Sequence, residues 1–296
     1  MKRFIGITLT IFLCLGLCAF GLWYNRASLR TDALMSGRIF SNPANALYPM
    51  RYPEAALPMA DGGYAILDDN GRRITRVDAQ GIVLWFAGND ASFGTFMAMD
   101  SSQDGTLYVI DRLEGSPRTE RVVRIDAQGT SAGIISQKSF SGSGSFVSGS
   151  LRIAGNEAWY LFTGDDGFTS MARADLASSR EKIVIKTEWR INRAALAVSG
   201  TDVYLAVGGG LLRWSSGRFQ ALTEYSSQLP RPGDIRAASD GTIYISDASR
   251  GLLSAIGKDG KLATVLSAEA LGKASARPTG VVFDSFAINP SGFTLV

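Results

Sequence analysis

Histidine is absent from this chain of 296 residues, and its two cysteines, Cys14 and Cys18, lie in the first apolar run. The lack of histidine removes the commonest metal ligand, the usual general base near neutral pH and the Ser-His-Asp arrangement. After Cys18 the chain can form neither a disulfide nor a thiolate metal site. Most familiar hydrolase chemistry is therefore excluded, and we predict no catalytic residue and no metal ligand.

A run dense in Lys and Arg is also missing. Four of the 30 Lys and Arg residues flank the first apolar run, whereas all 27 Asp and Glu residues follow it, so the rest of the chain is close to neutral. Nucleic-acid binding needs a basic face that neutralises phosphates. We therefore expect no nucleic-acid partner. A content of 46% hydrophobic and 19% charged residues is typical of a folded protein.

The first apolar run, residues 4–23, has no charge over twenty positions. At about 1.5 Å of rise per residue, a helix of this length crosses the roughly 30 Å hydrocarbon core of a bilayer. We predict one N-terminal transmembrane helix, with residues 1–30 as a membrane anchor or uncleaved signal sequence. Cleavage of this segment as a signal peptide is the alternative, although Ala19-Phe20-Gly21 is a poor match to a signal-peptide cleavage site. The short MKR terminus favours a single-pass cell-membrane protein whose remaining residues are extracytoplasmic.

A short pattern returns along the rest of the chain. The hexapeptide RVDAQG at 76–81 reappears as RIDAQG at 124–129, and DG occurs in DGGYAILDD, DGTLYVID and DGTIYISD. In each of the last three, an aspartate follows the glycine by six residues: Asp68, Asp111 and Asp247. Glycine supplies the positive φ of a tight turn, and the residues that follow suit a pleated strand. The aspartate can accept hydrogen bonds from backbone amides of the next turn.

Each copy continues with a third strand, a second turn and a fourth strand. The anchor positions 62, 105, 157, 201, 241 and 292 lie 40 to 52 residues apart, which matches the period of roughly 40 to 50 residues of propeller blades. Tyr108, Tyr160, Tyr204 and Tyr244 share one column of this alignment. We interpret the repeated Asp and Gly as turn residues and the tyrosines as packing between blades.

The pattern resembles the NHL-repeat type of β-propeller. The residues that carry the resemblance are PGDI at 232–235, leading into DGTIYISDASRGLLSAIGKDGKL, and PEAA at 53–56, leading into DGGYAILDDNGRRITRVDAQG. The resemblance implies a ring of four-stranded blades over residues 53–296 and says little about activity, because such propellers host enzymes, scaffolds and binding modules alike. The fold prediction is an all-β, six-bladed propeller, with a five-bladed or incomplete ring as the alternatives.

The last unit ends early. It reads DSFAINPSGFTLV and stops where its second strand should still run, and open sheet edges invite pairing with other chains. We predict that residues 31–52 are a linker and that its part at 36–52 supplies strands that close the ring. A chain truncated within a longer polypeptide, of which the propeller is the sensor portion, is the competing interpretation.

Connections between second and third strands share one propeller face with the joints between blades. Three enlarged loops gather there, and they are either flexible, solvated spacers or a partner surface. In the second interpretation Trp, Tyr and Arg supply most of the contact energy. The candidate binding residues are Arg112, Arg118, Arg121, Asp165, Asp166, Trp189, Arg190, Arg193, Tyr225 and Arg231, with Glu114 and Glu120 beside them.

Two functional hypotheses follow. The first is a membrane-anchored, extracytoplasmic binding or scaffolding propeller for a protein, a glycan or a small ligand. The second is a propeller enzyme with a calcium-type central site held by acids such as Asp165 and Asp166, since Ca²⁺ takes carboxylate and carbonyl oxygens. Neither acidic cluster has the full spacing of a calcium loop, so ordinary turns are the preferred interpretation and no cofactor is predicted.

Overall fold

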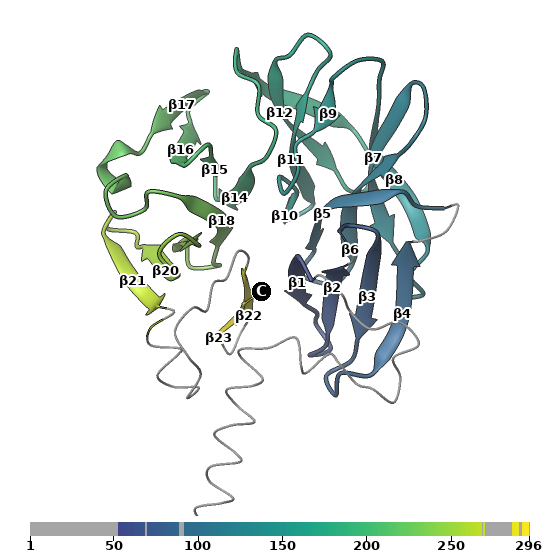
Figure 1. Cartoon of the computed structure of the whole chain (residues 1–296), viewed down its shortest axis with the longest axis horizontal. Helices are drawn as coiled ribbons and strands as arrows, with labels where there is room; N and C mark the ends of the chain where they lie inside the picture. Colours follow the sequence, from purple (N-terminus) through teal and green to yellow (C-terminus); the bar gives the residue numbers. More distant parts are fainter. Residues whose placement is uncertain are drawn as a thin grey trace, which may run out of the picture.

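A computed structural model of the protein describes residues 53–68, 70–88, 92–267, 269, 286–289 and 292–295. These residues form five antiparallel blade sheets, each with four strands in chain order and one with an additional short strand, arranged around an axis (Figure 1). The all-β propeller of four-stranded blades is therefore confirmed. Within the described ranges no helix is long and apolar enough to span a membrane. Residues 4–23, for which we predict a transmembrane helix, lie outside those ranges.

The strands of each blade follow one another from the axis outward in chain order. Blade 1 contains β1 (Ala55–Pro58), β2 (Tyr64–Asp68), β3 (Arg73–Val77) and β4 (Val83–Gly88). Blade 2 contains β5 (Thr95–Ser101), β6 (Leu107–Leu113), β7 (Arg118–Ile125) and β8 (Ser131–Phe140). Blade 3 contains β10 (Arg152–Ala154), β11 (Glu157–Thr163), β12 (Thr169–Asp175) and β13 (Glu181–Lys186), and the short β9 (Ser145–Phe146) also pairs with β11.

The last two complete blades follow the same order. Blade 4 contains β14 (Ala195–Ser199), β15 (Asp202–Val207), β16 (Gly210–Ser215) and β17 (Arg218–Ala221). A 3-10 helix, η1 (Thr223–Tyr225), lies in the joint to blade 5. Blade 5 contains β18 (Pro232–Ala237), β19 (Ile243–Asp247), β20 (Leu252–Ile256) and β21 (Leu262–Ser267).

A two-stranded hairpin, β22 (Phe286–Asn289) and β23 (Gly292–Leu295), follows the fifth blade. β22 contacts both β18 of blade 5 and β1 of blade 1, so the hairpin lies between the last and the first blade (Figure 1). The described residues thus form five complete blades and a hairpin, where we predicted six four-stranded blades. Within the described residues, the sixth copy of the repeat forms a first and a second strand. The predicted ring-closing residues 36–52 lie outside the described residues.

The DG turns form as the repeat predicts. Gly62, Gly105 and Gly241 have φ values of 81°, 82° and 87°, a region that strongly favours glycine. The aspartate before each glycine accepts a backbone N–H from two residues further on; the Asp104 carboxylate, for example, lies 2.9 Å from the Thr106 nitrogen. One turn with one capping carboxylate therefore starts the second strand of each strong copy.

The second repeated aspartate is buried at the opposite end of the same strand. Asp111 has no exposed surface; its carboxylate accepts the Gly94 N–H at 2.8 Å and pairs with Arg121 at 2.7 Å. Asp247, also fully buried, accepts the Arg231 N–H at 3.1 Å. Gly94 and Arg231 belong to the joints that enter blades 2 and 5. The carboxylates therefore hold the second strand to the joint that enters the blade. The prediction placed these bonds in the turn that follows the strand, so the acceptor role is confirmed but the bonded segment differs.

The core lies between adjacent sheets rather than in one central mass. Separate apolar clusters join blades 1 and 2, 2 and 3, 3 and 4, and 4 and 5. Tyr108 and Tyr160 are buried in the cluster between blades 2 and 3, and Tyr204 packs against the cluster between blades 4 and 5. For these three, the predicted packing of the tyrosine column is confirmed.

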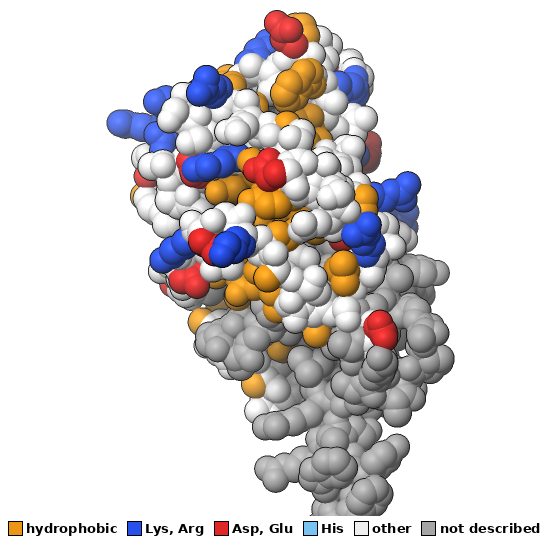
Figure 2. Space-filling model, turned by 90° about the vertical axis from the view of Figure 1, so that its left-hand side faces the viewer, with side chains coloured by type: hydrophobic (Ala, Val, Ile, Leu, Met, Phe, Trp, Pro, Cys, Tyr) orange, Lys and Arg blue, Asp and Glu red, His pale blue; other side chains and the backbone are white. Residues whose placement is uncertain are grey.

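Exposed apolar side chains on the outer strands are scattered. Leu84, Ile134, Ile183 and Val265 lie on β4, β8, β13 and β21, in four different blades. On the side of the molecule that Figure 2 shows, hydrophobic side chains alternate with Lys, Arg, Asp and Glu. Charges on an outer strand discourage pairing with other chains. Single exposed apolar side chains of this kind do not indicate an interface.

The Asp111 tether gives a stability test. Asp111→Ala leaves Arg121 and the Gly94 N–H without their buried carboxylate, and we expect the free energy of unfolding to fall by about 3 kcal/mol in urea titrations. Glu114→Ala, at an exposed loop position, should change it by less than about 0.5 kcal/mol. Equal effects of the two substitutions would contradict a structural role for the repeated aspartate.

Candidate functional site

The two faces of the ring differ in their loops. Joints between blades and connections between second and third strands form one face, which we call the upper face; the DG turns lie on the other, lower face. The predicted binding residues lie in upper-face connections or, for Arg112, Arg118 and Arg121, on β6 and β7 beside such a connection, with one exception described below.

A cavity of about 450 Å³ lies under the upper face. Pockets of roughly 300 to 1,000 Å³ are typical of small-ligand sites. Its residues come from blades 1, 2 and 3 and from the joint to blade 4: Glu54, Asn70, Thr95, Phe96, Met97, Arg112, Arg118, Ser143, Ser145, Phe146, Ser148, Thr163, Arg190, Ile191 and Asn192. Three of the predicted binding residues, Arg112, Arg118 and Arg190, thus line one cavity. We call it the upper cavity.

A buried carboxylate orients two of these arginines. Glu120 has no exposed surface, although we placed it beside the exposed binding residues; its Oε1 lies 2.7 Å from Nε of Arg112 and 2.9 Å from Nε of Arg118. Its Oε2 accepts the Phe146 N–H at 2.6 Å. The reason is register, because β6 and β7 pair Arg112 opposite Glu120 and turn that side chain toward β9. The pair of guanidinium groups is therefore ordered before any ligand arrives.

The joint over residues 141–146 is held by hydrogen bonds to two side chains, Asp165 and Arg190. The Asp165 carboxylate accepts the N–H groups of Gly144 at 2.8 Å, Ser141 at 2.9 Å and Gly142 at 3.1 Å. Arg190 donates to the hydroxyl and the carbonyl of Ser143, both at 2.8 Å. The bonds from Gly144 and Ser141 hold the pKa of Asp165 below its ordinary value. Asp165 thus shapes the cavity wall.

The neighbouring predicted residues have other partners. Asp166 pairs with Lys186 at 2.6 Å, and Arg121 pairs with Asp111. Trp189 is 52% exposed, and its ring centroid lies 6.2 Å from that of Phe219. Burial raises the pKa of Glu54, which lines the upper cavity, and the exposed Arg193 opposes that rise. Arg193 therefore acts electrostatically on the cavity from the next joint.

Tyr225 is misplaced in the prediction. It lies in η1, and its hydroxyl donates to the Gly260 carbonyl at 2.6 Å. Gly260 belongs to the turn between β20 and β21, which lies on the lower face. The joint from blade 4 to blade 5 is long enough for this side chain to pass between the blades. Arg231, in the same joint, is exposed on the upper side but is not among the residues that line the upper cavity.

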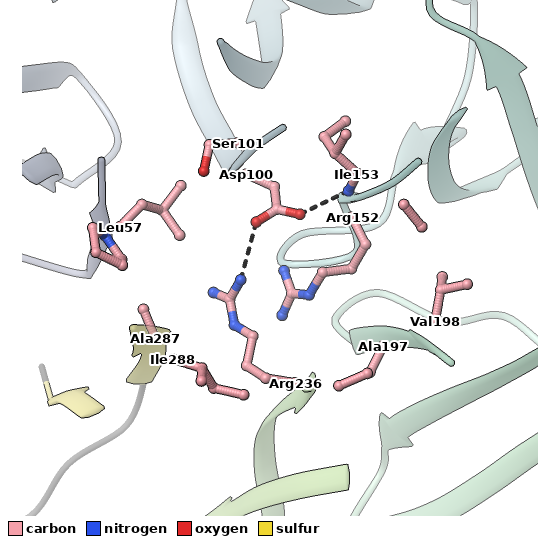
Figure 3. Close-up of a pocket in the computed structure, with 13 residues that line it drawn as sticks. Leu57, Asp100, Ser101, Arg152, Ile153, Ala197, Val198, Arg236, Ala287 and Ile288 are labelled. Atoms are coloured by element: carbon pink, nitrogen blue, oxygen red, sulfur yellow. Dashed lines mark hydrogen bonds and ion pairs between the residues drawn. The ribbon is translucent and has the colours of Figure 1, made fainter. Parts of the chain in front are cut away.

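A second, smaller cavity of about 220 Å³ lies on the axis toward the lower face (Figure 3). The last residues of the innermost strands form its wall, and most of these residues are apolar: Leu57, Pro58, Ile153, Ala154, Ala197, Val198, Ala237, Ala287 and Ile288. Asp100, Ser101, Arg152 and Arg236 complete the lining. We call it the axial cavity.

Four charged side chains meet at the axial cavity. Arg152 Nη2 lies 2.7 Å from Oδ1 of Asp234, and Arg236 Nη1 lies 3.1 Å from Oδ1 of Asp100. Arg236 Nε lies 3.4 Å from Oδ2 of Asp234. These contacts join β5, β10 and β18 of blades 2, 3 and 5 across the axis. The Phe286 N–H adds the hairpin, because it donates to Asp234 at 3.3 Å.

The residues at the axis are missing from the sequence prediction, yet the repeat contains a signal for them. Asp100, Arg152 and Arg236 each lie five residues before an anchor position, at 105, 157 and 241. One column of the innermost strand therefore holds a charge in three copies. Such a column must face the axis in a propeller, because alternate residues of a strand share one face.

Metal ligands do not cluster in the described residues of either cavity. No group of three or more Asp, Glu or Cys side chains lies close enough to hold a metal ion in the described part of the chain. Asp165 and Asp166, the residues we considered for a calcium site, are bonded to backbone amides and to Lys186. Two arginines at the axis would repel a cation there.

Comparisons with known proteins show a similarity of fold. No protein-family model and no curated protein matches the chain. A protein of unknown function from Bacteroides thetaiotaomicron matches with a TM-score of 0.59 at 13% identity, over 83% of this chain and 66% of that chain. A gluconolactonase from Xanthomonas campestris gives 0.54 at 14% identity, over 86% and 89%. A protein of unknown function from Bacteroides caccae gives 0.51 at 13% identity, over 73% and 83%.

These likenesses show a β-propeller and nothing finer. At such identities, neighbours with the same fold carry unrelated sites. The gluconolactonase therefore adds no residue role to this chain.

The pH dependence of stability tests the role of Asp165. Because its pKa is lowered in the folded protein, its contribution is fully present above its ordinary pKa of 3.8 and is lost as the pH falls through the folded value. We expect Asp165→Ala to lower the melting temperature at pH 7, and this difference from the wild type to shrink as the pH falls below about 4. If the difference in melting temperature between the variant and the wild type is unchanged at pH 3, the charged form of Asp165 does not stabilise the loop.

Proposed function

We propose that the chain is a membrane-anchored, extracytoplasmic binding module that takes a glycan or another small polyhydroxyl ligand in the upper cavity. The observation that carries the proposal is the set of three arginines, Arg112, Arg118 and Arg190, which line one cavity and are ordered by the protein itself. A relationship to NHL-repeat propellers is part of this proposal and is supported by the repeat pattern and the blade architecture.

The groups along the cavity wall suit binding better than catalysis. Glu54 is the only acid among the residues that line the upper cavity, so a pair of carboxylates for general acid and base is lacking there. The sequence has no histidine that could act in place of the second carboxylate. Enzyme chemistry in this cavity would need groups that its wall does not offer.

The polar groups of the wall match a sugar. Ser143, Ser145 and Ser148 offer hydroxyl groups, and Asn70 and Asn192 offer amides, while Phe96 and Phe146 provide apolar surface. Hydroxyl and amide groups both donate and accept hydrogen bonds, as sugar hydroxyls do. Ligand sites commonly combine apolar surface with a few placed polar groups.

A glycan array with the full-length protein in detergent is the first test, followed by calorimetric titration of a bound glycan. Arg190→Met removes charged donors at the cavity wall, and we expect it to raise the Kd about tenfold or more. Arg218→Met, on β17 at an exposed position, is the matched control and should leave the Kd unchanged. Binding that survives Arg190→Met, or no glycan signal at all, would contradict this ligand class.

The anchor is tested by fractionation. We expect the full-length protein to stay in the membrane pellet after alkaline carbonate, because a helix over residues 4–23 is held by the hydrocarbon core. Its N-terminal sequence should include the MKR residues. A soluble species that begins near Leu22 would show cleavage and would overturn the anchored form.

A further inference from the structure

The axial cavity has more hydrogen-bond donors than acceptors. Arg152 donates through Nη1 to the Leu151 carbonyl and through Nη2 to Asp234 and to the Ile235 carbonyl. Its Nε is buried and has no hydrogen-bond partner among the described residues. The Arg152 side chain is only 9% exposed, so bulk water does not satisfy this donor. A buried N–H without a partner costs roughly 1 to 3 kcal/mol.

Arg236 repeats the same shortage. Its Nη1 donates to Asp100 at 3.1 Å, but its Nε is buried without a hydrogen-bond partner in the described part of the chain. Oδ2 of Asp234 lies 3.4 Å from this Nε but makes no hydrogen bond to it, and other carboxylate oxygens nearby already accept backbone N–H groups. Oδ2 of Asp100 accepts the Ile153 N–H at 2.7 Å, and Oδ1 of Asp234 accepts the Ile235 N–H at 2.9 Å. Donors of both arginines therefore remain for an acceptor that comes from outside.

The two arginines also repel one another, although each is paired with an aspartate. Burial lowers the pKa of Arg152, and the neighbouring Arg236 guanidinium lowers it further. Burial also lowers the pKa of Arg236, but the negative charges of Asp234 and Asp100 outweigh burial, so the pKa of Arg236 is raised overall. Figure 3 shows the two guanidinium groups side by side at the centre of the cavity. An additional anion there would relieve the repulsion between them.

The wall selects the shape of such an anion. Leu57, Ile153, Val198 and Ile288 surround the charged centre with apolar surface. The cavity of about 220 Å³ has room for about seven waters at about 30 Å³ each, or for a ligand with a similar number of heavy atoms. A small head group with a short hydrocarbon tail fits both features, whereas a phosphate would leave the apolar wall in contact with water.

We propose that the axial cavity binds a small monocarboxylate with a short aliphatic tail, whose carboxylate accepts hydrogen bonds from Arg152 and Arg236. A planar carboxylate matches the fork of donors on a guanidinium group. The tail lies against the apolar ends of the innermost strands. This site is separate from the upper cavity, and it takes an anion where a calcium-type central site would take a cation.

Differential scanning fluorimetry and calorimetry on the full-length protein in detergent test the site with three matched probes: butyrate, butyramide and butylammonium, all at constant ionic strength. Ligand that binds the folded state raises the melting temperature. We expect a concentration-dependent rise with butyrate alone. Acetate should bind more weakly than butyrate, because it lacks the apolar tail. An equal rise with butyramide, or none with butyrate, would overturn the proposal.

Variants separate the axial site from the upper cavity. Arg236→Lys keeps the charge but loses the fork of donors, and we expect it to raise the Kd for butyrate about tenfold or more. The paired change Arg236→Met with Asp100→Asn removes one charge of each sign, so it keeps the cavity balanced and gives a second variant if the first folds poorly. Arg190→Met, in the upper cavity, should leave butyrate binding unchanged. If butyrate binding is lost with Arg190→Met and kept with Arg236→Lys, the anion binds in the upper cavity and the proposal is wrong.

Discussion

Asp234 receives an ion pair from Arg152, a weaker one from Arg236 and the backbone N–H of Phe286, and so links three strands around the axis. A ring of blades must hold its innermost strands together where they converge, and in this chain four charges occupy the point where apolar residues alone would leave a void. Breaking one member of a buried pair leaves an uncompensated charge, at a cost of about 3 to 5 kcal/mol. The positions of blades 2, 3 and 5 and of the hairpin β22–β23 therefore depend on this network.

On the upper face, charged side chains likewise hold separate segments of the chain together. Buried or bonded carboxylates, namely Asp111, Glu120, Asp165 and Asp247, accept backbone N–H groups of the joints and hold loops that would otherwise be flexible. Because Glu120 and Asp165 fix the cavity wall in advance, a ligand that enters the upper cavity would lose less affinity to loop ordering. The glycine- and serine-rich joint at 141–146 looks like a flexible spacer in the sequence, but its backbone is bonded to Asp165 and Arg190.

The candidate site was only partly predictable. Arg112, Arg118 and Arg190 follow from the rule that places joints and second-to-third strand connections on one face. Glu120 does not, because its burial depends on the pairing register of β6 and β7. Tyr225 fails for a different reason, because a long joint allows its side chain to reach Gly260 on the lower face. The column of Asp100, Arg152 and Arg236 was present in the repeat, but three charges with the same offset identify a site only when the axis around which they converge is known.

The sequence by itself determined the repeating unit, because turns that need glycine at positive φ and strands that alternate are local properties of a few neighbouring residues. It therefore predicted an all-β propeller, four strands in each blade and structural roles for the repeated aspartates. Tertiary structure alone decided that the described residues build five complete blades and a hairpin, that two cavities exist, and which arginines face them. These features arise between residues far apart in the chain, such as Arg152 and Asp234, and local spacing does not show which of them meet.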